Sequence, residues 1–549
     1  GYNNRVLILL DGFPVLIPNS SSPDWNSLPL EGLQRIEINN NAASAQYGHN
    51  SMGGVINLIT DPQKNSKSTV IKLSTGSYDI RQTNICYSGY KNNLSFGSNI
   101  LLRTADGHRY NSDNTINRVQ SFIKFQDEHG RNYRFSYLLS DSELGHPGFD
   151  LEGSNKYRRS NRVSQYIQLQ GFYALATGLS MSHSIFLNKF KTNYSNRKDI
   201  PNWWLEGRTL DKNTEYNDLN WGLRSEVIFT QLSRWVLMMG YDFDYSKTAV
   251  DLLNQQYGNP TQISFGGFMQ SKYSIGSGFN FNTGIRYDYR KTDPGNDYQP
   301  RAYTNLSPKI SLNYSNSDRK SVSISYSQGF RAPSISELYL RHETTYGLIV
   351  AGSPDLLPEK VYSYEICYKN FSQSNYKLEI ALFNNEYNNM IDFVYSVPTK
   401  SENRKGVVSK GFEYQFDYLL SENIAVDVNY SYLDMKDLEG NKVLYRSKHK
   451  AQIYLLLNNA TWNFKIGADG QSLQYYEDFL EEFDYSIGFP VKKLPGRIIP
   501  ELIVEKKYKS FSGSFRIYNL LDQKYSLIQD YTMPGRTWQF TLTKIIEGS

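Results

Sequence analysis

Cysteine is scarce in this sequence, with only Cys86 and Cys367 among 549 residues. Two thiols are too few for a disulfide framework or for a metal site built from thiolates. Long apolar runs are also missing, because none approaches the ~18 residues that a membrane-spanning helix needs. Charge of one sign is not in excess: 59 Lys and Arg stand against 54 Asp and Glu. A net charge of +5, evenly spread, does not indicate nucleic-acid binding.

Aromatic residues, in contrast, are plentiful, with 44 Tyr, 28 Phe and 7 Trp. Together with a hydrophobic content of 39% they are enough to form a core, which excludes intrinsic disorder. Many segments alternate apolar and polar residues with a period of two, for example 322–327, 362–369, 412–418 and 538–542. Because successive side chains of a strand face opposite sides, each segment predicts a strand with one apolar and one polar face.

The connections between these strands alternate in length. Short polar turns at 316–320, 370–376, 419–423, 458–461 and 506–510 alternate with long connections at 328–360, 386–409, 433–447, 472–495 and 519–535. Outer-membrane barrels have this organisation, with short periplasmic turns and long extracellular loops. The alternation places the C-terminus on the periplasmic side. The predicted strands begin near Lys309, Ser321, Val361, Lys377, Lys410, Ile424, Lys448, Trp462, Arg497, Phe511 and Arg536.

The number of strands follows from their density. Eleven strands occupy 309–543, and the stretch 63–308 has a similar length, so the total is about 22. We therefore predict an all-β membrane protein, an antiparallel transmembrane barrel formed by residues 63–549. A barrel of this width needs a plug in its lumen. The excess of Tyr and Phe also fits aromatic girdles at the two membrane interfaces.

Residues 1–62 have a different character. Val6–Leu10 is a continuous apolar run, typical of a strand buried on both faces, and a turn at Asp11 and Gly12 ends it. We expect a short helix at 27–33, a strand at 35–38 and a buried strand at 53–60, where paired glycines permit close backbone approach. These elements predict a small α+β unit, too small to be stable alone, that fills the lumen.

Several motifs follow one another along the chain. Residues 9–15 read LLDGFPV, 33–38 LQRIEI, 43–48 ASAQYG and 53–60 GGVINLIT; the barrel adds GFRAPSISELY at 329–339, GSPDLLPE at 352–359, NLLDQKY at 519–525 and PGR at 534–536. In this order they resemble the motifs of TonB-dependent outer-membrane receptors, and residues 1–62 resemble the C-terminal part of the plug domain. The plug positions that carry the resemblance are Asp11, Gly12, Arg35, Glu37, Tyr47, Gly48, Gly53, Gly54 and Asn57.

The resemblance implies active uptake of a scarce small nutrient across the outer membrane of a Gram-negative bacterium. A ligand would bind at the extracellular loops and the plug, and TonB would act on the plug from the periplasm. No bond is made or broken, so the protein is not expected to be an enzyme and needs no cofactor. Siderophore-bound iron, cobalamin, haem and small oligosaccharides all remain open as the transported ligand. The lipid bilayer and a surface lipoprotein that captures ligand are further partners of this kind of receptor.

The sequence departs from the family pattern at its N-terminal end. Family plugs are about twice as long, and the half that carries the TonB-binding segment is not in this sequence. TonB is therefore expected to act through a segment outside this chain. The alternative is a plugged, receptor-like barrel that serves as a structural or interaction subunit of an outer-membrane assembly without active transport. A passive porin is disfavoured by the plug motifs.

Three charged plug residues, Asp11, Arg35 and Glu37, are candidates for holding the plug in place. A plug inside a polar lumen needs hydrogen-bonded charges that face the barrel wall. We expect structural roles for all three rather than direct roles in gating.

His342 lies between the two barrel motifs at 329–339 and 352–359, with Tyr346 close by. Haem receptors of the family that this chain resembles place a haem-ligating histidine between these two motifs, often paired with a plug histidine. The resemblance therefore implies His342 as a candidate haem ligand, and His49 could supply the plug histidine. Imidazole and phenolate are both suitable axial ligands of iron. A solvated loop histidine is the simpler interpretation, and haem ranks below the other ligands taken together.

The connection 472–495 combines aromatic residues, including Tyr475 and Tyr476, with five carboxylates. The carboxylates lack the spacing of a calcium loop, and we predict no metal site. Aromatic-lined concavities bind small ligands, so this connection, 328–360 and 386–409 are expected to form the ligand vestibule. The sequence contains no nucleophile elbow, phosphate loop or metalloprotease motif, which agrees with a non-enzymatic function.

Overall fold

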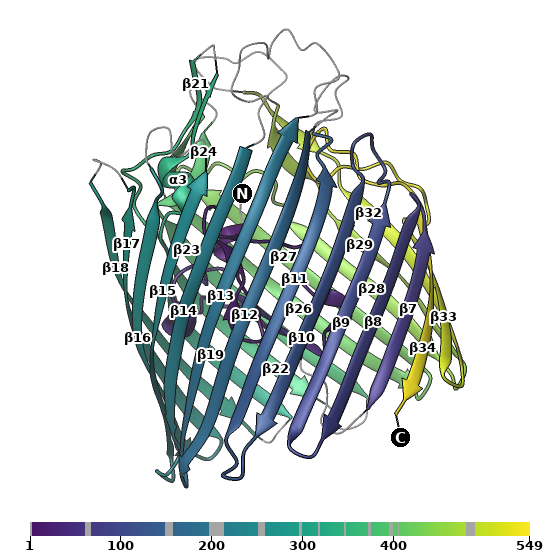
Figure 1. The fold of residues 1–549 in the computed structure, drawn as a ribbon, viewed down its shortest axis with the longest axis horizontal. Coiled ribbons are helices and arrows are strands. Elements are labelled where there is room, and N and C mark those ends of the chain that lie inside the picture. The colour runs from purple at the N-terminus through teal and green to yellow at the C-terminus, as the bar shows by residue number, and fades with distance from the viewer. Residues whose placement is uncertain are drawn as a thin grey trace.

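The computed structural model describes residues 3–60, 67–148, 158–196, 214–250, 258–295, 299–316, 319–344, 347–371, 375–394, 399–404, 406–478 and 489–548. Within them, 22 antiparallel strands close into one barrel around a small N-terminal unit (Figure 1). The predicted fold is therefore confirmed. The boundary predicted between residues 62 and 63 lies outside the described residues.

The first half of the barrel comes from the stretch in which the sequence predicted about eleven strands. Its strands are β7 (Ser68–Gly76), β8 (Ile80–Lys91), β9 (Leu94–Ala105), β10 (Asn114–Gln126), β11 (Asn132–Gly145), β12 (Arg158–Ala176), β13 (Leu179–Asn196), β14 (Thr214–Phe229), β15 (Trp235–Val250), β16 (Thr261–Gly276) and β17 (Phe279–Asp293).

The second half contains the eleven strands whose starts were predicted individually. They are β18 (Arg301–Ser315), β19 (Lys320–Arg331), β22 (Glu359–Phe371), β23 (Tyr376–Asn388), β26 (Val407–Ser421), β27 (Ile424–Asp437), β28 (His449–Asn458), β29 (Trp462–Gln471), β32 (Arg497–Tyr508), β33 (Phe511–Tyr518) and β34 (Thr537–Glu547). Only β18 begins well before its predicted start, because the polar residues at its extracellular end hide the alternation. β34 pairs with β7 and closes the barrel.

The alternating residues face lipid and lumen in turn. Ile324 of β19 and its partner Ile366 of β22 keep 54% and 48% of their surface exposed on the outside of the barrel. Tyr326 and Tyr364 lie beside them, with ring centroids 5.2 Å apart. Ser327, the next residue of β19, is buried. Exposed apolar side chains in such a row are stable because the surrounding solvent is lipid.

Residues 3–60 form the lumen unit, called the plug below. A four-stranded mixed sheet of order β2-β1-β6-β5 is its centre, and β1 runs parallel to β6. Its strands are β1 (Leu7–Leu10), β2 (Phe13–Pro14), β3 (Leu16–Ile17), β4 (Ser22–Pro23), β5 (Arg35–Asn39) and β6 (Val55–Ile59), and its helices are η1 (Asn3–Arg5), η2 (Leu30–Gly32) and α1 (Ser44–Tyr47). The helix predicted over 27–33 is only the single 3-10 turn η2.

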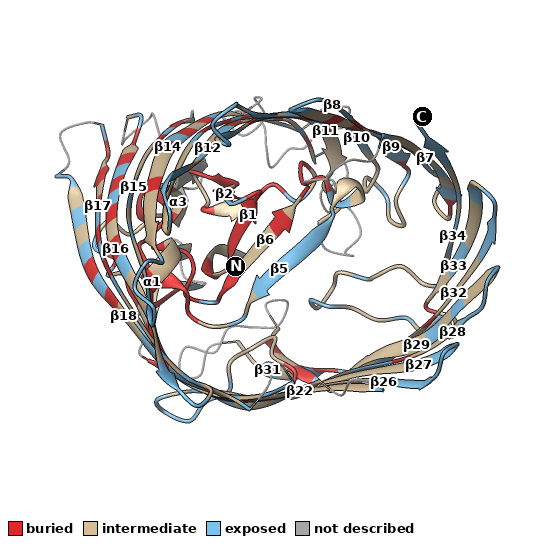
Figure 2. Cartoon of the chain, turned by 90° about the horizontal axis from the view of Figure 1, so that it is seen from below, coloured by how far each residue is buried: buried red, intermediate tan, exposed pale blue. Residues whose placement is uncertain are grey.

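The plug packs against one side of the lumen. Ile8, Leu10 and Leu58 share a hydrophobic core with Tyr166 and Phe190 of the barrel wall. Seen from below, the plug sheet lies nearer to β10–β18 than to the opposite wall (Figure 2). All four residues of β1 are buried, as the apolar run predicted, whereas Ile36 and Ile38 of the edge strand β5 are 52% and 65% exposed.

The long connections carry structure of their own. The connection from β19 to β22 contains α3 (Ile335–Tyr339), β20 (Arg341–Thr344) and β21 (Gly347–Ala351), and the connection from β23 to β26 contains β24 (Met390–Val394) and β25 (Thr399–Arg404). These strands form one sheet of order β20-β21-β25-β24. β30 (Gln474–Glu477) and β31 (Val491–Leu494) form a hairpin between β29 and β32. Figure 1 shows α3, β21 and β24 at the end of the barrel opposite the C-terminus.

Helices of the described part are short, and none is long and apolar enough to cross a membrane.

The fold predicts the behaviour of the purified protein in detergent. Unheated samples should migrate faster on denaturing gels than boiled ones, because a closed barrel resists unfolding by detergent at room temperature. Circular dichroism should show a strand-dominated spectrum that is lost on boiling. A spectrum with substantial helix would contradict the barrel.

Candidate functional site

The most deeply buried charges of the described molecule join the plug to the barrel. Glu359, at the start of β22, lies between Arg331 of β19 and Arg5 of the plug, and the side chains of Glu359 and Arg331 have no exposed surface. Arg331 donates to both Glu359 oxygens at 2.8 Å, and Arg5 donates to them at 2.9 and 2.5 Å. A carboxylate in this position compensates two buried cations at once. We call Arg5, Arg331 and Glu359 the clasp.

The extracellular connections also reach the clasp. Glu337 of α3 accepts two hydrogen bonds from Arg331 and forms a capping box with Ser334. The backbone of Ile391 in β24 donates to Glu359 at 2.6 Å and accepts from Arg5 at 2.9 Å. Both connections that form the extracellular sheet are therefore bonded to the same ionic group.

Asp11 anchors a second contact between plug and wall. It accepts hydrogen bonds from the backbone and hydroxyl of Thr60 at 2.8 and 2.7 Å, and it pairs with Arg134 of β11 at 2.8 Å. Gln170 of β12 donates to the Asp11 carbonyl. These contacts join Asp11 to the barrel wall, and its structural role stays a prediction.

Arg35 and Glu37 lie elsewhere. They pair with each other along β5 at 2.7 Å, with side chains 57% and 48% exposed. Asn57 links this pair to the turn, because it donates to Glu37 and accepts from the backbone of Gly12. The expectation that both charges face barrel-wall residues is not met in the described contacts. Asn40 and Asn41 instead reach the opposite wall, at Glu413 and Glu365.

Glycines occur where the plug backbone has no room for a side chain. Gly54 has φ of +110°, and an added Cβ would lie 2.3 Å from the carbonyl oxygen of Asn39. Gly48 has φ of +74°, and its Cβ would meet the Arg286 guanidinium at 2.7 Å. At Gly53, which has no positive φ, an added Cβ would be 3.0 Å from the carbonyl oxygen of Arg5. Tyr47 is the last residue of α1, and the guanidinium of Arg224 lies over its ring. Burial raises the pKa of the Tyr47 hydroxyl.

His49 faces the barrel wall. Arg290 of β17 donates a hydrogen bond to its Nε2, and Asp244 of β15 lies 4.0 Å from the same atom. Burial, and then the neighbouring Arg290, hold the pKa of His49 well below its usual range. The imidazole is therefore neutral at neutral pH and acts as an acceptor.

The remaining predicted ligand residues belong to the extracellular connections. His342 lies in β20, where its backbone pairs with Val350, and Tyr346 lies outside the described residues. Tyr475 and Tyr476 are neighbours in β30, opposite Lys493 and Lys492 of β31. Tyr476 is buried. Tyr475 accepts a hydrogen bond from Lys442 at 2.7 Å, which lowers its pKa. Residues 479–488 of this connection, with three of its five carboxylates, are outside the described part.

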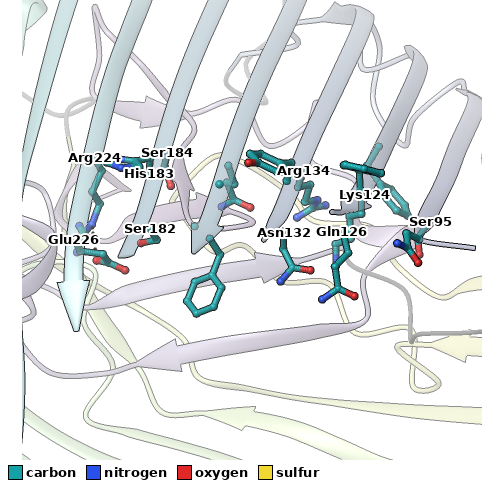
Figure 3. A pocket seen from close by; sticks show the side chains of 18 of the residues that line it. Ser95, Lys124, Gln126, Asn132, Arg134, Ser182, His183, Ser184, Arg224 and Glu226 are labelled. Atoms are coloured by element: carbon teal, nitrogen blue, oxygen red, sulfur yellow. Dashed lines mark hydrogen bonds and ion pairs between the residues drawn. The ribbon is translucent and has the colours of Figure 1, made fainter. Parts of the chain in front are cut away.

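Cavities lie between the plug and the barrel wall. One of about 840 Å³ lies between Gly12 and Tyr47 of the plug and the turn-side ends of β8–β14; Figure 3 shows Lys124, Arg134, His183 and Arg224 along it. Another, of about 600 Å³, lies between Asn40 and the wall from β23 to β33. Its wall includes Lys450 and Arg497. Among the described residues no group of three or more His, Cys, Asp and Glu is arranged to hold a metal ion.

The clasp was not predicted from the sequence. Arg331, Glu337 and Glu359 fall inside the quoted motifs, but Arg5 is 354 residues from Glu359 along the chain. The signal that could have found these three residues is a charged residue inside a motif of mostly apolar or small residues. Charged side chains are almost never fully buried unless they are paired.

Comparisons with known proteins agree with this architecture. A family model described as "TonB dependent receptor-like, beta-barrel" matches residues 69–520, and one described as "TonB-dependent Receptor Plug Domain" matches residues 1–55. The vitamin B12 transporter BtuB of Photobacterium profundum is 23% identical over 561 residues, which cover 98% of this chain and 84% of that protein. An iron-regulated outer membrane virulence protein of Vibrio cholerae is 24% identical over 489 residues, which cover 80% and 69%.

Solved structures share the fold. The siderophore receptor PirA from Acinetobacter baumannii superposes with a TM-score of 0.81 at 15% identity, covering 99% of this chain and 91% of that one. The copper transporter OprC gives a TM-score of 0.83 at 14% identity, covering 99% and 93%.

The clasp predicts a large effect of Arg5→Ala. Removing this guanidinium leaves Glu359 with one cation and removes the plug residue from a buried ion cluster. The free energy that holds the plug docked should fall by about 3 kcal/mol or more. Hydrogen exchange of the β1 amides should then accelerate by about a hundredfold or more in the folded protein. Arg35→Ala is the matched control, because an exposed pair contributes less than about 1 kcal/mol. Equal protection in both variants would contradict the clasp.

His49 predicts a pH dependence of plug docking. Its pKa is depressed in the folded protein, so the unfolded plug takes up a proton more readily as the pH falls through the ordinary histidine value near ~6.5. The stability contributed by neutral His49 is present above that pH and is lost below it. Protection of the amides around residues 44–51 should therefore fall between about pH 7 and pH 5 in the wild type and change less in His49→Gln. An identical pH profile in the two proteins would exclude His49 as the titrating group.

Proposed function

Because the chain belongs to the family of TonB-dependent receptors, we propose that it binds a scarce small nutrient in a vestibule between its extracellular loops and the plug and releases it to the periplasm when TonB acts on the plug. It is an outer-membrane transporter and not an enzyme. The observation that supports the mechanism best is the docked plug. A plug held to the barrel wall by buried ion pairs and a hydrophobic core moves only if energy is supplied.

The vestibule of this proposal is bounded by the three long connections that the sequence singled out. Two of them share a sheet through the parallel pairing of Val350 with Thr399 and of Ala351 with Lys400. The third contributes Tyr475 and Tyr476, with Lys442 over the ring of Tyr475 at 3.9 Å. Aromatic and cationic groups around a concavity are suited to an extended, partly polar chelate.

Ligand binding and plug position are connected in this proposal through Ile391. A ligand that shifts β24 would change the backbone contacts of Ile391 with Glu359 and Arg5. Because only differential contacts can move an equilibrium, weakening these bonds lowers the work needed to release the plug. TonB would act on the plug from the periplasm, and a surface lipoprotein would deliver ligand to the loops.

Cobalamin and iron siderophores are the favoured ligands. Relatives named as vitamin B12 transporters and one named as an iron-regulated outer membrane virulence protein match over most of the chain, although identities of 22–24% do not select a ligand. Haem ranks below them, because the Nε2 lone pair of His49 is already engaged by Arg290.

Binding assays on the purified protein test this ranking. Cyanocobalamin or ferric enterobactin should quench the intrinsic fluorescence saturably, and Tyr475→Ala should weaken that binding about tenfold, as expected for one lost aromatic contact of ~1.4 kcal/mol. Tyr90→Ala, at the periplasmic end, is the matched control. The absorption spectrum of haem should not shift when haem is added to the protein. A haem spectrum that shifts and is restored by His342→Ala would reverse the ranking.

A further inference from the structure

The cavity of about 600 Å³ beside Asn40 is lined by two cations, Lys450 of β28 and Arg497 of β32. Both side chains belong to the lumen face of their strands. Ile453 and Ile498, on the opposite face of the same two strands, keep 55% and 63% of their surface exposed on the outside of the barrel. We call Lys450 and Arg497 the inner pair.

Strand register brings the members of the inner pair together. Lys450 is paired with Gln471 of β29, and Gln471 is paired with Arg497, so the three residues form one row across neighbouring strands. With strands ~4.8 Å apart, the backbones of Lys450 and Arg497 are separated by about 10 Å. The long side chains of the pair can therefore both reach one anion held between them, with the amide of Gln471 behind it.

The charge of the inner pair is not compensated within the described part of the protein. Neither Lys450 nor Arg497 forms an ion pair with a carboxylate there. Arg497 lies over the ring of Tyr525 at 5.2 Å, and its Nη1 is buried without a hydrogen-bond partner among the described residues. Arg446, in the connection that precedes β28, adds positive charge near Lys450. Such a group of cations is suited to an external anion.

The inner pair lies directly below the proposed vestibule. β28 begins at His449 and β32 at Arg497, so both members stand at the extracellular ends of their strands. The backbone of Ser472 donates to the carbonyl of His449, and the backbone of His449 donates to the Ser472 hydroxyl at 3.1 Å. Ser472 opens the connection that carries Tyr475 and Tyr476. A ligand that leaves these tyrosines along this wall meets the inner pair first.

The wall below the inner pair changes from cations to carboxylates and amides. Glu413 lies in the same row as Lys450, two strands away, with Ser431 between them. Its described side-chain hydrogen bond comes from Asn40, at 3.5 Å. An anion is therefore favoured at the inner pair and disfavoured beyond it, whereas amides can bond the neutral polar groups of the same molecule. The next row toward the periplasm consists of Glu379, Gln415, Asn429, Gln452 and Asp469.

The plug is held away from this wall. The clasp and the pair of Asp11 with Arg134 join it to β11, β19 and β22. On the side of β26–β32, Figure 2 shows β5 as the plug strand that borders the lumen, and its Ile36 and Ile38 are exposed. Passage beside β5 therefore disturbs fewer of the described contacts than passage along the opposite wall.

We propose that the inner pair is a binding site for an anionic group of the imported molecule (a carboxylate, a phosphate or a catecholate), occupied after the vestibule and before release to the periplasm. This inference rests on the proposed function, because it gives the ligand a second position on its way past the plug. Lysine and arginine bind such oxyanions through charge-assisted hydrogen bonds, which arginine forms in a bidentate manner. The amide row below accepts the uncharged polar groups, so the site fits an anionic molecule rich in amides or hydroxyls.

Diffraction from crystals of the purified receptor soaked in sodium tungstate tests the anion site directly. Tungstate is a tetrahedral oxyanion like phosphate, and tungsten gives a strong anomalous signal. An anomalous peak is expected between the Nζ of Lys450 and the guanidinium of Arg497 in the wild type, and no peak in Lys450→Gln/Arg497→Gln. Wild-type crystals without a peak at the inner pair would overturn the site. Heat-modifiable gel migration establishes that the variant is folded.

Uptake by cells tests whether the site serves import. Lys450→Gln/Arg497→Gln should accumulate radiolabelled cyanocobalamin or ferric enterobactin about tenfold more slowly than the wild type, because two charge-assisted bonds are lost, with unchanged binding at the cell surface. The control variant Lys320→Gln/Lys507→Gln removes the same charge at the periplasmic turns and should transport as the wild type does.

The outcomes separate this inference from the proposed function. A wild-type uptake rate in Lys450→Gln/Arg497→Gln would mean that the inner pair holds an adventitious ion only, and an equal loss of surface binding would make the pair part of the vestibule; each result overturns the inference and leaves the proposed function intact. If the wild type itself accumulates neither ligand, the proposed function fails and the role in transit fails with it, and the tungstate peak alone decides whether the anion site exists.

Discussion

A single buried carboxylate, Glu359, holds the extracellular connections, the barrel and the plug in one arrangement. Without Glu359, the desolvated guanidinium groups of Arg5 and Arg331 would lose the carboxylate that they share. Desolvating charges is expensive, and the cost is offset only when geometry and hydrogen bonding are complete. In the clasp both carboxylate oxygens of Glu359 accept hydrogen bonds from the two guanidinium groups, at 2.5–2.9 Å. The plug is thus fixed by a contact that is strong when intact and weak once one member moves.

The position of this contact explains how a plugged barrel can respond to a ligand. Ile391 is part of the extracellular sheet, yet its backbone bonds to two members of the clasp. The plug occupies one side of the lumen, and a cavity of about 600 Å³ remains beside Asn40. Release of the clasp would therefore free a small domain next to existing space. Energy from TonB is needed because the remaining contacts, including Asp11 with Arg134 and the shared hydrophobic core, still hold the plug.

Local patterns were sufficient to predict the barrel but not the plug's contacts. Alternation at Ile324 and Ile366 is a property of neighbouring residues in the chain, and it fixes which side faces lipid. The apolar run at β1 likewise predicted a strand buried on both faces. The pairing of Arg5 with Glu359 and the parallel contact of β21 with β25 join distant segments, and nothing in the local sequence specifies such partners. Arg35 and Glu37 belong to the plug motifs, but whether β5 faces the wall or open lumen depends on where the whole plug sits.

Uptake measured in living cells tests the central claim, energised import through a plugged barrel, most directly. Cells that carry this protein as their only receptor of the family would be given radiolabelled cyanocobalamin and ferric enterobactin, with and without a protonophore. The account predicts accumulation of at least one of these ligands, and loss of accumulation but not of surface binding when the proton gradient collapses. Accumulation that continues without the gradient would contradict it, because a plug held by the clasp would then not be what limits transport.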